Sequence, residues 1–198
     1  MPKLFFTRHY PIIIVTALVL LTAAAGDNVT EALRFERQAI LNGELYRLLS
    51  AHIVHLSWPH TLMNLTAAVI GWYLFHDAMN NKHWLLSLAG CGLVISLLLL
   101  GIDTLQWYVG FSGIIHGVML QGLVLDRQLG RGSKSIMLSG LILKVAYEQW
   151  QGRSISSFEA IGGDVVLEAH LFGLAGGLLM LALPRLAKRV PFNQQGDN

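Results

Sequence analysis

The chain has 198 residues, of which 54% are hydrophobic and 13% are charged, and its formal net charge at pH 7 is +2. Its mean hydropathy of +0.53 is too high for a soluble domain of this length, so the composition excludes the soluble classes of protein. We therefore expect an all-α membrane protein that forms a single domain over residues 1–198.

Six apolar stretches follow one another along the chain and predict six transmembrane helices, at residues 10–25, 58–75, 84–101, 110–125, 135–150 and 165–183. With a rise of about 1.5 Å per residue, each approaches the ~30 Å of hydrocarbon that a spanning helix must cross. The first stretch has an alternative interpretation. Lys3 and Arg8, the short apolar core and the small residues of "TAAAG" are also typical of a cleaved signal peptide.

The longest loop, residues 26–57, mixes apolar and charged residues in "TEALRFERQAIL". This pattern predicts a helix that lies in the membrane interface between the first two spans. Thr30 or Asn28 would be its N-cap, and the "NG" pair at 42–43 would end it.

The distribution of lysine and arginine predicts the orientation of the chain in the membrane. If the N-terminus is cytoplasmic, nine basic residues lie on inner segments: Lys3, Arg8, Lys82, Arg127, Arg131, Lys134, Arg185, Lys188 and Arg189. Only four lie on outer loops: Arg34, Arg37, Arg47 and Arg153. By the positive-inside rule, both termini are expected to face the cytoplasm.

Eight polar residues interrupt the predicted spans: His60, Asn64, Ser112, His116, Lys144, Glu148, Glu168 and His170. Polar groups inside a membrane are costly and usually indicate a partner or a function. Counting about 1.5 Å per residue from the outer end of each span places Asn64, Lys144 and His170 in one layer, about 8 to 9 Å deep. Ser112 is shallower by this count, unless the loop before it dips into the membrane.

Ser112 stands in "GFSGIIHG", at the start of the fourth apolar stretch. A hydroxyl becomes a nucleophile when a base such as histidine takes its proton, and the free N–H groups of a helical first turn can stabilise an oxyanion. Gly110 and Gly113 would permit the backbone bend that exposes the hydroxyl. Taken alone, the same residues are equally compatible with simple helix packing.

Three motifs together resemble the signatures of the rhomboid intramembrane serine proteases. They are "GFSG" with Ser112, "HTLMN" from His60 to Asn64, and "AHLFGLAGG" from Ala169 to Gly177. The resemblance extends from about residue 43 to 177 and implies a six-helix rhomboid-like bundle. Within the family, "GFSGIIHG" and "LKVAYEQ" resemble the rhombosortase branch, whose pattern is G-x-S-G-x-x-H-G; other rhomboids carry an aromatic residue at position 116.

The resemblance implies a catalytic dyad, with Ser112 as nucleophile and His170 as base, and without an acidic member. Glu168 is two residues from His170 and therefore lies on another face of its helix. The resemblance also implies that the oxyanion and substrate are held by the Ser112 amide together with Gly110 and the side chains of His60 and Asn64.

Further residues are expected to support this pair. Gly113 and Gly173 would let their helices approach closely. His116 could support the His170 ring or be the base itself, and the resemblance favours support. Lys144 and Glu148 are four residues apart and can pair. They form either a structural ion pair, with Glu148 reaching the outer interface, or a site where Lys144 meets the substrate.

Rhombosortases are thought to process bacterial exported proteins that end in a glycine-rich motif, a transmembrane helix and a basic cluster. The resemblance thus implies an enzyme of the bacterial inner membrane that opens toward the periplasm. It would cleave such a tail and pass the acyl group to water or to an amine. Membrane lipid and tail helices are the expected partners, and neither a metal, a cofactor nor nucleic acid is expected. The alternatives are an ordinary rhomboid protease, a non-catalytic helix-binding protein and a small ion carrier.

Overall fold

The computed structural model describes residues 2–152 and 162–187, and the side chains within 6–152 and 162–183. Its long helices are α1 (Pro2–Ala25), α5 (Trp58–Phe75), α6 (Asn81–Leu99), α7 (Ser112–Leu125), α8 (Arg131–Gln151) and α10 (Glu168–Ala187). Each overlaps one of the predicted spans. Three basic residues of the charge count, Arg153, Lys188 and Arg189, lie outside the described residues.

Two segments of the described chain are long and apolar enough to cross a membrane by length and composition: Phe6–Ala25 and Asn81–Leu99. The apolar helices Ser112–Leu125 and Glu168–Leu183 are shorter. Both begin later than predicted, because the expected spans started at residues 110 and 165. Each of these two helices therefore opens directly at, or two residues before, a predicted catalytic side chain.

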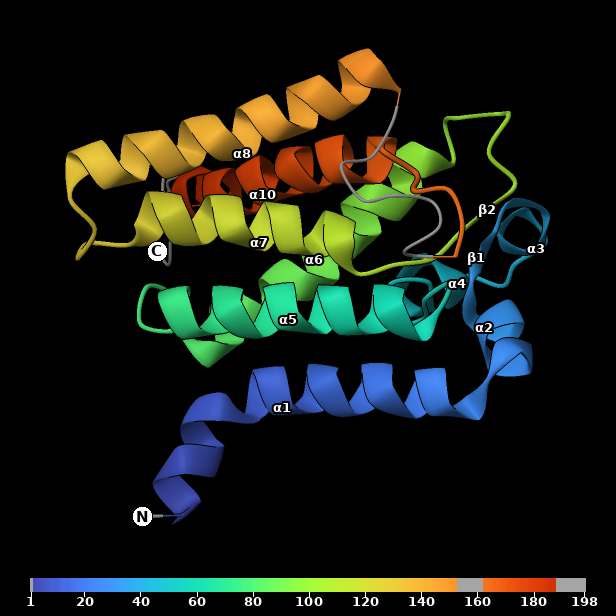
Figure 1. The fold of residues 1–198 in the computed structure, drawn as a ribbon, viewed down its shortest axis with the longest axis horizontal. Coiled ribbons are helices and arrows are strands. Elements are labelled where there is room, and N and C mark those ends of the chain that lie inside the picture. The colour runs from blue at the N-terminus through green and yellow to red at the C-terminus, as the bar shows by residue number, and fades with distance from the viewer. Residues whose placement is uncertain (1, 153–161, 188–198) are drawn as a thin grey trace, which may run out of the picture.

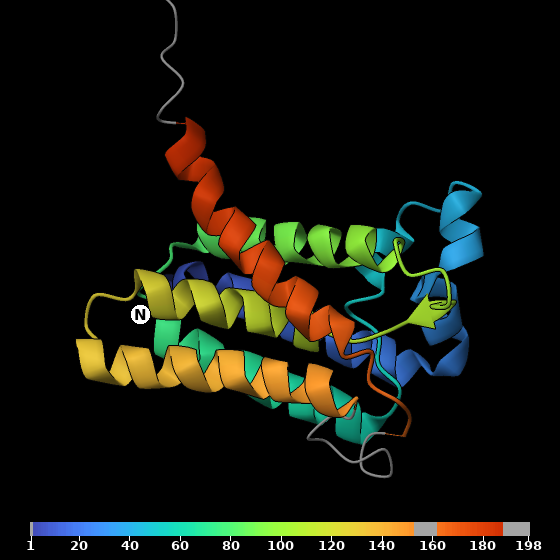
Figure 2. The ribbon, with the colours of Figure 1, turned by 90° about the horizontal axis from the view of Figure 1, so that it is seen from above.

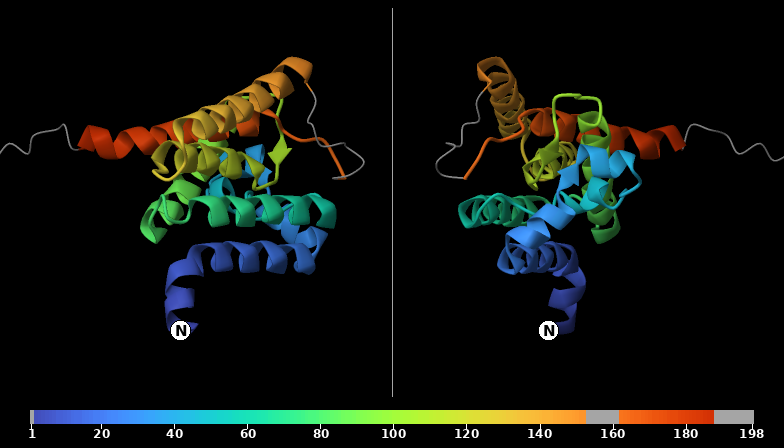
Figure 3. Two further views of the ribbon diagram at one scale, coloured as in Figure 1. Left: turned by 60° about the vertical axis from the view of Figure 1, so that its left-hand side comes forward. Right: turned by 90° about the vertical axis from the view of Figure 1, so that its right-hand side faces the viewer.

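The long helices form one bundle, with the short elements gathered at one end (Figure 1). Helix α10 crosses α7 and α6 and packs against both (Figure 2). Helix α1 lies on the outside of the bundle against α5 and α6 (Figure 3). Helices α5, α7 and α10 begin, and α8 ends, at the end that carries the short elements (Figure 1).

Helices α7 and α10 touch through their backbones. A Cβ atom on Gly113 would lie 2.6 Å from the carbonyl oxygen of Ala169, and one on Gly177 would lie 2.5 Å from that of Gly117. A Cβ atom on Gly173 would overlap the carbonyl oxygen of Gly113. Small residues at such crossings allow the close van der Waals packing that holds helices together in lipid. The Gly113 and Ala169 contact joins the residue after Ser112 to the residue before His170.

The loop between α1 and α5 differs from the single interfacial helix that its sequence predicts. It contains α2 (Asp27–Leu33), α3 (Arg37–Leu41) and α4 (Arg47–Ser50), and its first helix starts after Gly26, so neither Asn28 nor Thr30 is the N-cap. The helical pattern breaks at β1 (Phe35–Glu36), which pairs antiparallel with β2 (Trp107–Tyr108). The predicted stop is present, because α3 ends at Leu41 and Gly43 has a φ of 107°.

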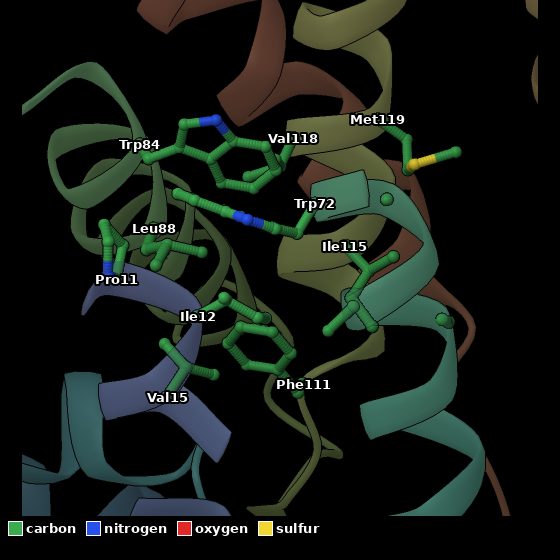
Figure 4. A pocket seen from close by; sticks show the side chains of 13 residues that line it. Pro11, Ile12, Val15, Trp72, Trp84, Leu88, Phe111, Ile115, Val118 and Met119 are labelled. Carbon is green, nitrogen blue, oxygen red and sulfur yellow. The ribbon is translucent and has the colours of Figure 1, made fainter. Parts of the chain in front are cut away.

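The middle of the bundle is apolar. A cavity of about 20 Å³ lies among α1, α5, α6 and α7, with Trp72, Trp84 and Phe111 on its walls (Figure 4). Its lining carries few polar groups, so we interpret it as a packing defect of the core and not as a reactive site. Toward the other end of α7, Gln121 accepts hydrogen bonds from Ser87 Oγ at 2.8 Å and pairs with His83 Nε2 at 3.0 Å.

Candidate active site

Ser112 and His170 meet where α7 and α10 begin. Ser112 is the first residue of α7, and His170 lies in the first turn of α10. Ser112 Oγ is 2.8 Å from His170 Nε2, and the His170 side chain is buried. At this distance the imidazole can take the serine proton. The structure therefore brings the two predicted catalytic residues within hydrogen-bond reach, although they are 58 positions apart.

The depth difference estimated between these residues arises from the assumed start of the last helix. Counting from Asp164 made His170 deeper than Ser112, but α10 begins only at Glu168. Both side chains thus belong to the first turns of neighbouring helices. Glu168 itself is exposed and contributes nothing to the pair, as its position in the helix predicts.

His116 packs on the imidazole of His170. The ring centroids of His116 and His170 are 4.3 Å apart and the planes differ by 22°, so the rings stack. His116 Nδ1 donates to the Ser112 carbonyl oxygen at 2.7 Å, and its Nε2 accepts from Lys144 Nζ at 2.8 Å. Both ring nitrogens of His116 are therefore engaged away from the serine hydroxyl, which is the geometry of a support rather than of the base.

The predicted oxyanion donors, His60 and Asn64, line the same cavity as Ser112. Asn64 is buried, and its Nδ2 group has no hydrogen-bond partner among the described residues. His60 Nδ1 accepts from the Leu56 amide at 3.4 Å, which leaves its Nε2–H as a donor. A buried donor without a partner is costly in a resting protein, and such groups often serve a ligand. Both side chains are thus suited to a developing negative charge.

Gly110 sets the turn before Ser112. Its φ of 130° is open to glycine but strained for other residues, and a Cβ atom there would lie 3.3 Å from the His60 ring. Its amide donates to the Ala51 carbonyl at 3.1 Å, and its carbonyl accepts from the Tyr108 hydroxyl at 2.6 Å. The glycine therefore allows both the bend and the close approach of His60.

The environment of Glu148 differs from one of the two interpretations of the sequence. The structural ion pair placed Glu148 at the outer interface, and the resemblance implied a dyad without an acid, but the Glu148 side chain is 1% exposed and its Oε2 lies 2.9 Å from His170 Nδ1. Lys144 Nζ donates to the same oxygen at 2.9 Å. The i,i+4 spacing predicted that Lys144 and Glu148 share a face of α8, but it did not indicate that this face meets His170. An acidic residue inside a span was the available signal.

The ligand atoms of His116, Glu148 and His170 lie within 4.8 Å of one another, a spacing that could hold a metal ion. However, Lys144 Nζ donates to two of these groups, His116 and Glu148. An ammonium and a metal cation would compete for the same electron pairs. The donor set fits the lysine as it stands, and we assign no metal chemistry to it.

The site opens into a cavity of about 240 Å³ that is bordered by α5, α7, α8 and α10. Ser112, His170, His60, Asn64, Lys144 and Glu148 all contribute to its lining. Met63, Ala67 and Ile115 provide apolar surface beside them. A mainly apolar cavity with a few convergent polar groups is the usual form of a substrate site.

Two further residues hold the loop between α1 and α5. Arg47 donates to the carbonyl oxygens of Glu31 and Arg34 at 3.0 and 2.9 Å and so ties the loop to itself. His55 has no hydrogen-bond partner for either ring nitrogen among the described residues. It packs edge-on against His60 instead, with ring centroids 5.0 Å apart.

Comparison with known proteins identifies the family. The Rhomboid domain family model matches residues 42–185, which is most of the chain. A relative from Bacillus subtilis (strain 168), named "Putative rhomboid protease YdcA", is 25% identical over 146 residues, which cover 71% of this chain and 68% of the relative. The matched region includes Ser112, His170, His60 and Asn64. The chain belongs to the rhomboid family of integral membrane serine proteases.

Proposed function

We propose that this protein is an intramembrane serine protease in which Ser112 is the nucleophile and His170 the general base. The observation that carries the proposal is the 2.8 Å contact between Ser112 Oγ and His170 Nε2, at the edge of a cavity that also holds the unpartnered amide of Asn64. A serine packed only for structure would need neither a histidine base nor a vacant donor beside it.

The proposed reaction begins when Ser112 Oγ attacks a peptide carbonyl of the substrate and His170 Nε2 takes the hydroxyl proton. The carbonyl oxygen becomes an oxyanion, which the Ser112 amide and the side chains of His60 and Asn64 stabilise. The C–N bond then breaks, and His170 returns the proton to the leaving amine. This leaves an acyl ester on Ser112, which water or an amine cleaves with His170 again acting as base.

We further propose that the substrate is the C-terminal tail of an exported bacterial protein, as in the rhombosortase branch. The support is the G-x-S-G-x-x-H-G pattern of residues 110–117 and the stacking of His116 on His170, where other rhomboids carry an aromatic residue. An ordinary rhomboid protease that cleaves unrelated transmembrane helices is the alternative, and it would share all of the chemistry.

The proposed setting is the bacterial inner membrane, with six spanning helices in one domain and both termini in the cytoplasm. The basic residues at the ends of the helices support this orientation. It places the first turns of α7 and α10, and hence the active site, near the periplasmic face. Cysteine labelling at exposed positions of the outer loop, such as Glu44→Cys, with a reagent that does not cross the membrane would test it.

The test of function uses purified full-length protein in lipid vesicles. Wild type should cleave a fusion protein that ends in a glycine-rich motif, an apolar helix and a basic cluster, and it should react at Ser112 with a fluorophosphonate. Ser112→Ala and His170→Ala should each abolish cleavage, because members of a catalytic unit lose nearly all activity singly.

The identity of the products separates the candidate functions. Mass spectrometry of the new C-terminus distinguishes hydrolysis from transfer to an amine. Equal cleavage of an unrelated transmembrane helix that lacks the tail would favour the ordinary rhomboid. Appreciable cleavage by purified Ser112→Ala would contradict the protease assignment altogether.

A further inference from the structure

Glu148 is the feature of the molecule that a two-residue catalytic unit does not explain. Helix α8 has 21 residues, yet only Val145 and Glu148 are buried among them. A carboxylate loses its hydration when it is buried, which costs on the order of several kcal/mol unless charged or hydrogen-bonding partners compensate for it. Helix α8 packs Met137, Leu138 and Leu141 against the apolar core. Its buried acid is directed at the imidazole of His170.

The hydrogen bonds of His170 have one consistent assignment. Its Nε2 faces Ser112 Oγ at 2.8 Å and must be unprotonated in order to take the serine proton. The single proton of the neutral ring is therefore on Nδ1, where it is donated to Glu148 Oε2 at 2.9 Å. An ionised carboxylate at Nδ1 selects this tautomer, because it can accept a hydrogen bond but cannot donate one.

Lys144 holds the carboxylate in its ionised form. Its ammonium group donates to Glu148 Oε2 at 2.9 Å and to His116 Nε2 at 2.8 Å. Lys144 Nζ also lies 3.4 Å from His170 Nδ1, but both atoms carry protons in the assignment above, so we interpret this approach as proximity and not as a hydrogen bond. The Lys144 side chain is 30% exposed while that of Glu148 is 1% exposed, so the lysine closes the cluster on the cavity side.

We propose that Glu148 is a positioning residue, and that Ser112, His170 and Glu148 act as a three-membered unit whose carboxylate Lys144 holds in place. The inference rests on the proposed protease function and goes beyond the dyad that the sequence motifs imply. Glu148 fixes the tautomer and orientation of His170 in the resting state. When His170 takes the serine proton, the carboxylate stabilises the imidazolium, as acids do in other serine hydrolases.

A purely structural role is the competing explanation. Under that explanation Glu148 only neutralises Lys144 inside the membrane, and His170 is an incidental neighbour. The two explanations differ in what a variant without either charge can do. A protein with methionine at 144 and glutamine at 148 has no unpaired charge to bury, so its stability should recover in both cases. Only the positioning role predicts that its catalysis stays impaired.

The experiment compares wild type, Glu148→Gln, Glu148→Asp and Lys144→Met/Glu148→Gln as full-length proteins in lipid vesicles. For each we would measure Tm, kcat and KM with a cleavable transmembrane substrate, and the rate of fluorophosphonate labelling against pH. The positioning role predicts that Glu148→Gln lowers kcat by about 10² to 10⁴ with little change in KM. Glu148→Asp should recover part of kcat, since it keeps the charge.

The pH profile shows whether the carboxylate beside His170 is ionised in the working enzyme, and it complements the comparison of kcat with Tm. The titratable groups that face His170 are Ser112 and His116 from α7, Lys144 and Glu148 from α8, and His60 from α5. Without the carboxylate, the imidazolium loses its stabilising neighbour. The acidic limb of the kcat profile should therefore move to lower pH in Glu148→Gln, and by less in the double variant, which also loses the neighbouring ammonium of Lys144.

The outcomes are distinct. Low kcat in the double variant despite a wild-type Tm supports the positioning role, and wild-type kcat in that variant overturns it. If wild type labels at Ser112 and Glu148→Gln labels at the same rate with the same pH dependence, only the role of Glu148 fails. If wild type neither labels nor cleaves, the protease function fails and the role of Glu148 fails with it.

Discussion

Replacing Gly113 by alanine should move Ser112 away from His170 although neither of these two residues is changed. The added Cβ atom would lie 2.6 Å from the Ala169 carbonyl oxygen and 3.0 Å from Ile95 Cδ1. Ordinary contact begins at 3.4 Å, so the backbones of α7 and α10 must move apart by about 0.8 Å. The contact is with a backbone carbonyl group, which, unlike a side chain, cannot change rotamer to avoid the added Cβ atom.

The displacement acts directly on the catalytic distance. Gly113 follows Ser112 and Ala169 precedes His170, so the same shift would lengthen the Ser112 Oγ to His170 Nε2 distance from 2.8 Å to about 3.6 Å. That is beyond hydrogen-bond length. A misplacement of about 1 Å costs roughly 10² in rate. We expect kcat to fall by about that factor, while the higher helix propensity of alanine, worth about 1 kcal/mol, limits the loss of stability.

The assay is cleavage of a transmembrane substrate by purified variants, with Tm and fluorophosphonate labelling measured on the same samples. Gly140→Ala is the matched control, because the added Cβ on α8 would have no atom of the described residues within 4 Å beyond its own stretch of helix. Gly173→Ala provides an independent version of the test, since its Cβ would meet the Gly113 carbonyl. Cleavage by Gly113→Ala within threefold of wild type would refute the argument that this contact sets the catalytic distance.

Three further predictions concern buried side chains. Asn64→Ala should lower kcat by about 10² to 10³, the usual effect of one oxyanion donor, and a wild-type rate would exclude Asn64 from that role. His116→Phe should keep measurable cleavage because phenylalanine can still stack on His170, whereas His170→Phe should show none; the reverse result would exchange their roles. His52 lies in the turn before α5, and burial lowers the pKa of its imidazole to about 4. The unfolded chain binds this proton near pH 6.5 and the folded one does not, so His52 destabilises the fold progressively as pH falls from about 6.5 to 4. The Tm of wild type should fall more steeply over this range than that of His52→Gln, and parallel curves would show that His52 does not titrate on unfolding.

The sequence predicted where the long helices lie because each contains an apolar stretch, but most of their ends differ from the predicted ones by one to eight residues. Trp58–Phe75 matches its predicted span at both ends. At its N-terminal end, the Ser57 side chain accepts a hydrogen bond from the His60 amide as an N-cap. The loop at 26–57 was predicted less well. Local propensity favours one helix there, but pairing of Phe35 with Tyr108, far along the chain, breaks it. Such long-range pairing has no local signal.

The environment of Glu148 could not be predicted for a different reason. Helical periodicity relates Lys144 to Glu148 on one helix, but it does not determine how that helix is rotated about its axis in the bundle. The rotation depends on packing against α7 and α10. Ser112, His170 and Asn64, by contrast, could be assigned to one site from the sequence. Their motifs resemble those of a family in which these residues lie close together.

The short antiparallel pair of β1 and β2 has a consequence for protein engineering. Tyr108, which pairs with Phe35, also donates to the Gly110 carbonyl, and the Gly110 amide is anchored to Ala51. The turn before Ser112 is thus bound at two points to the loop between α1 and α5. Exchanging that loop with the loop of another rhomboid would therefore also change the position of Ser112. A chimera that keeps Ser112 in position would need to transfer residues 107–110 together with the loop, because the two segments are bonded to each other.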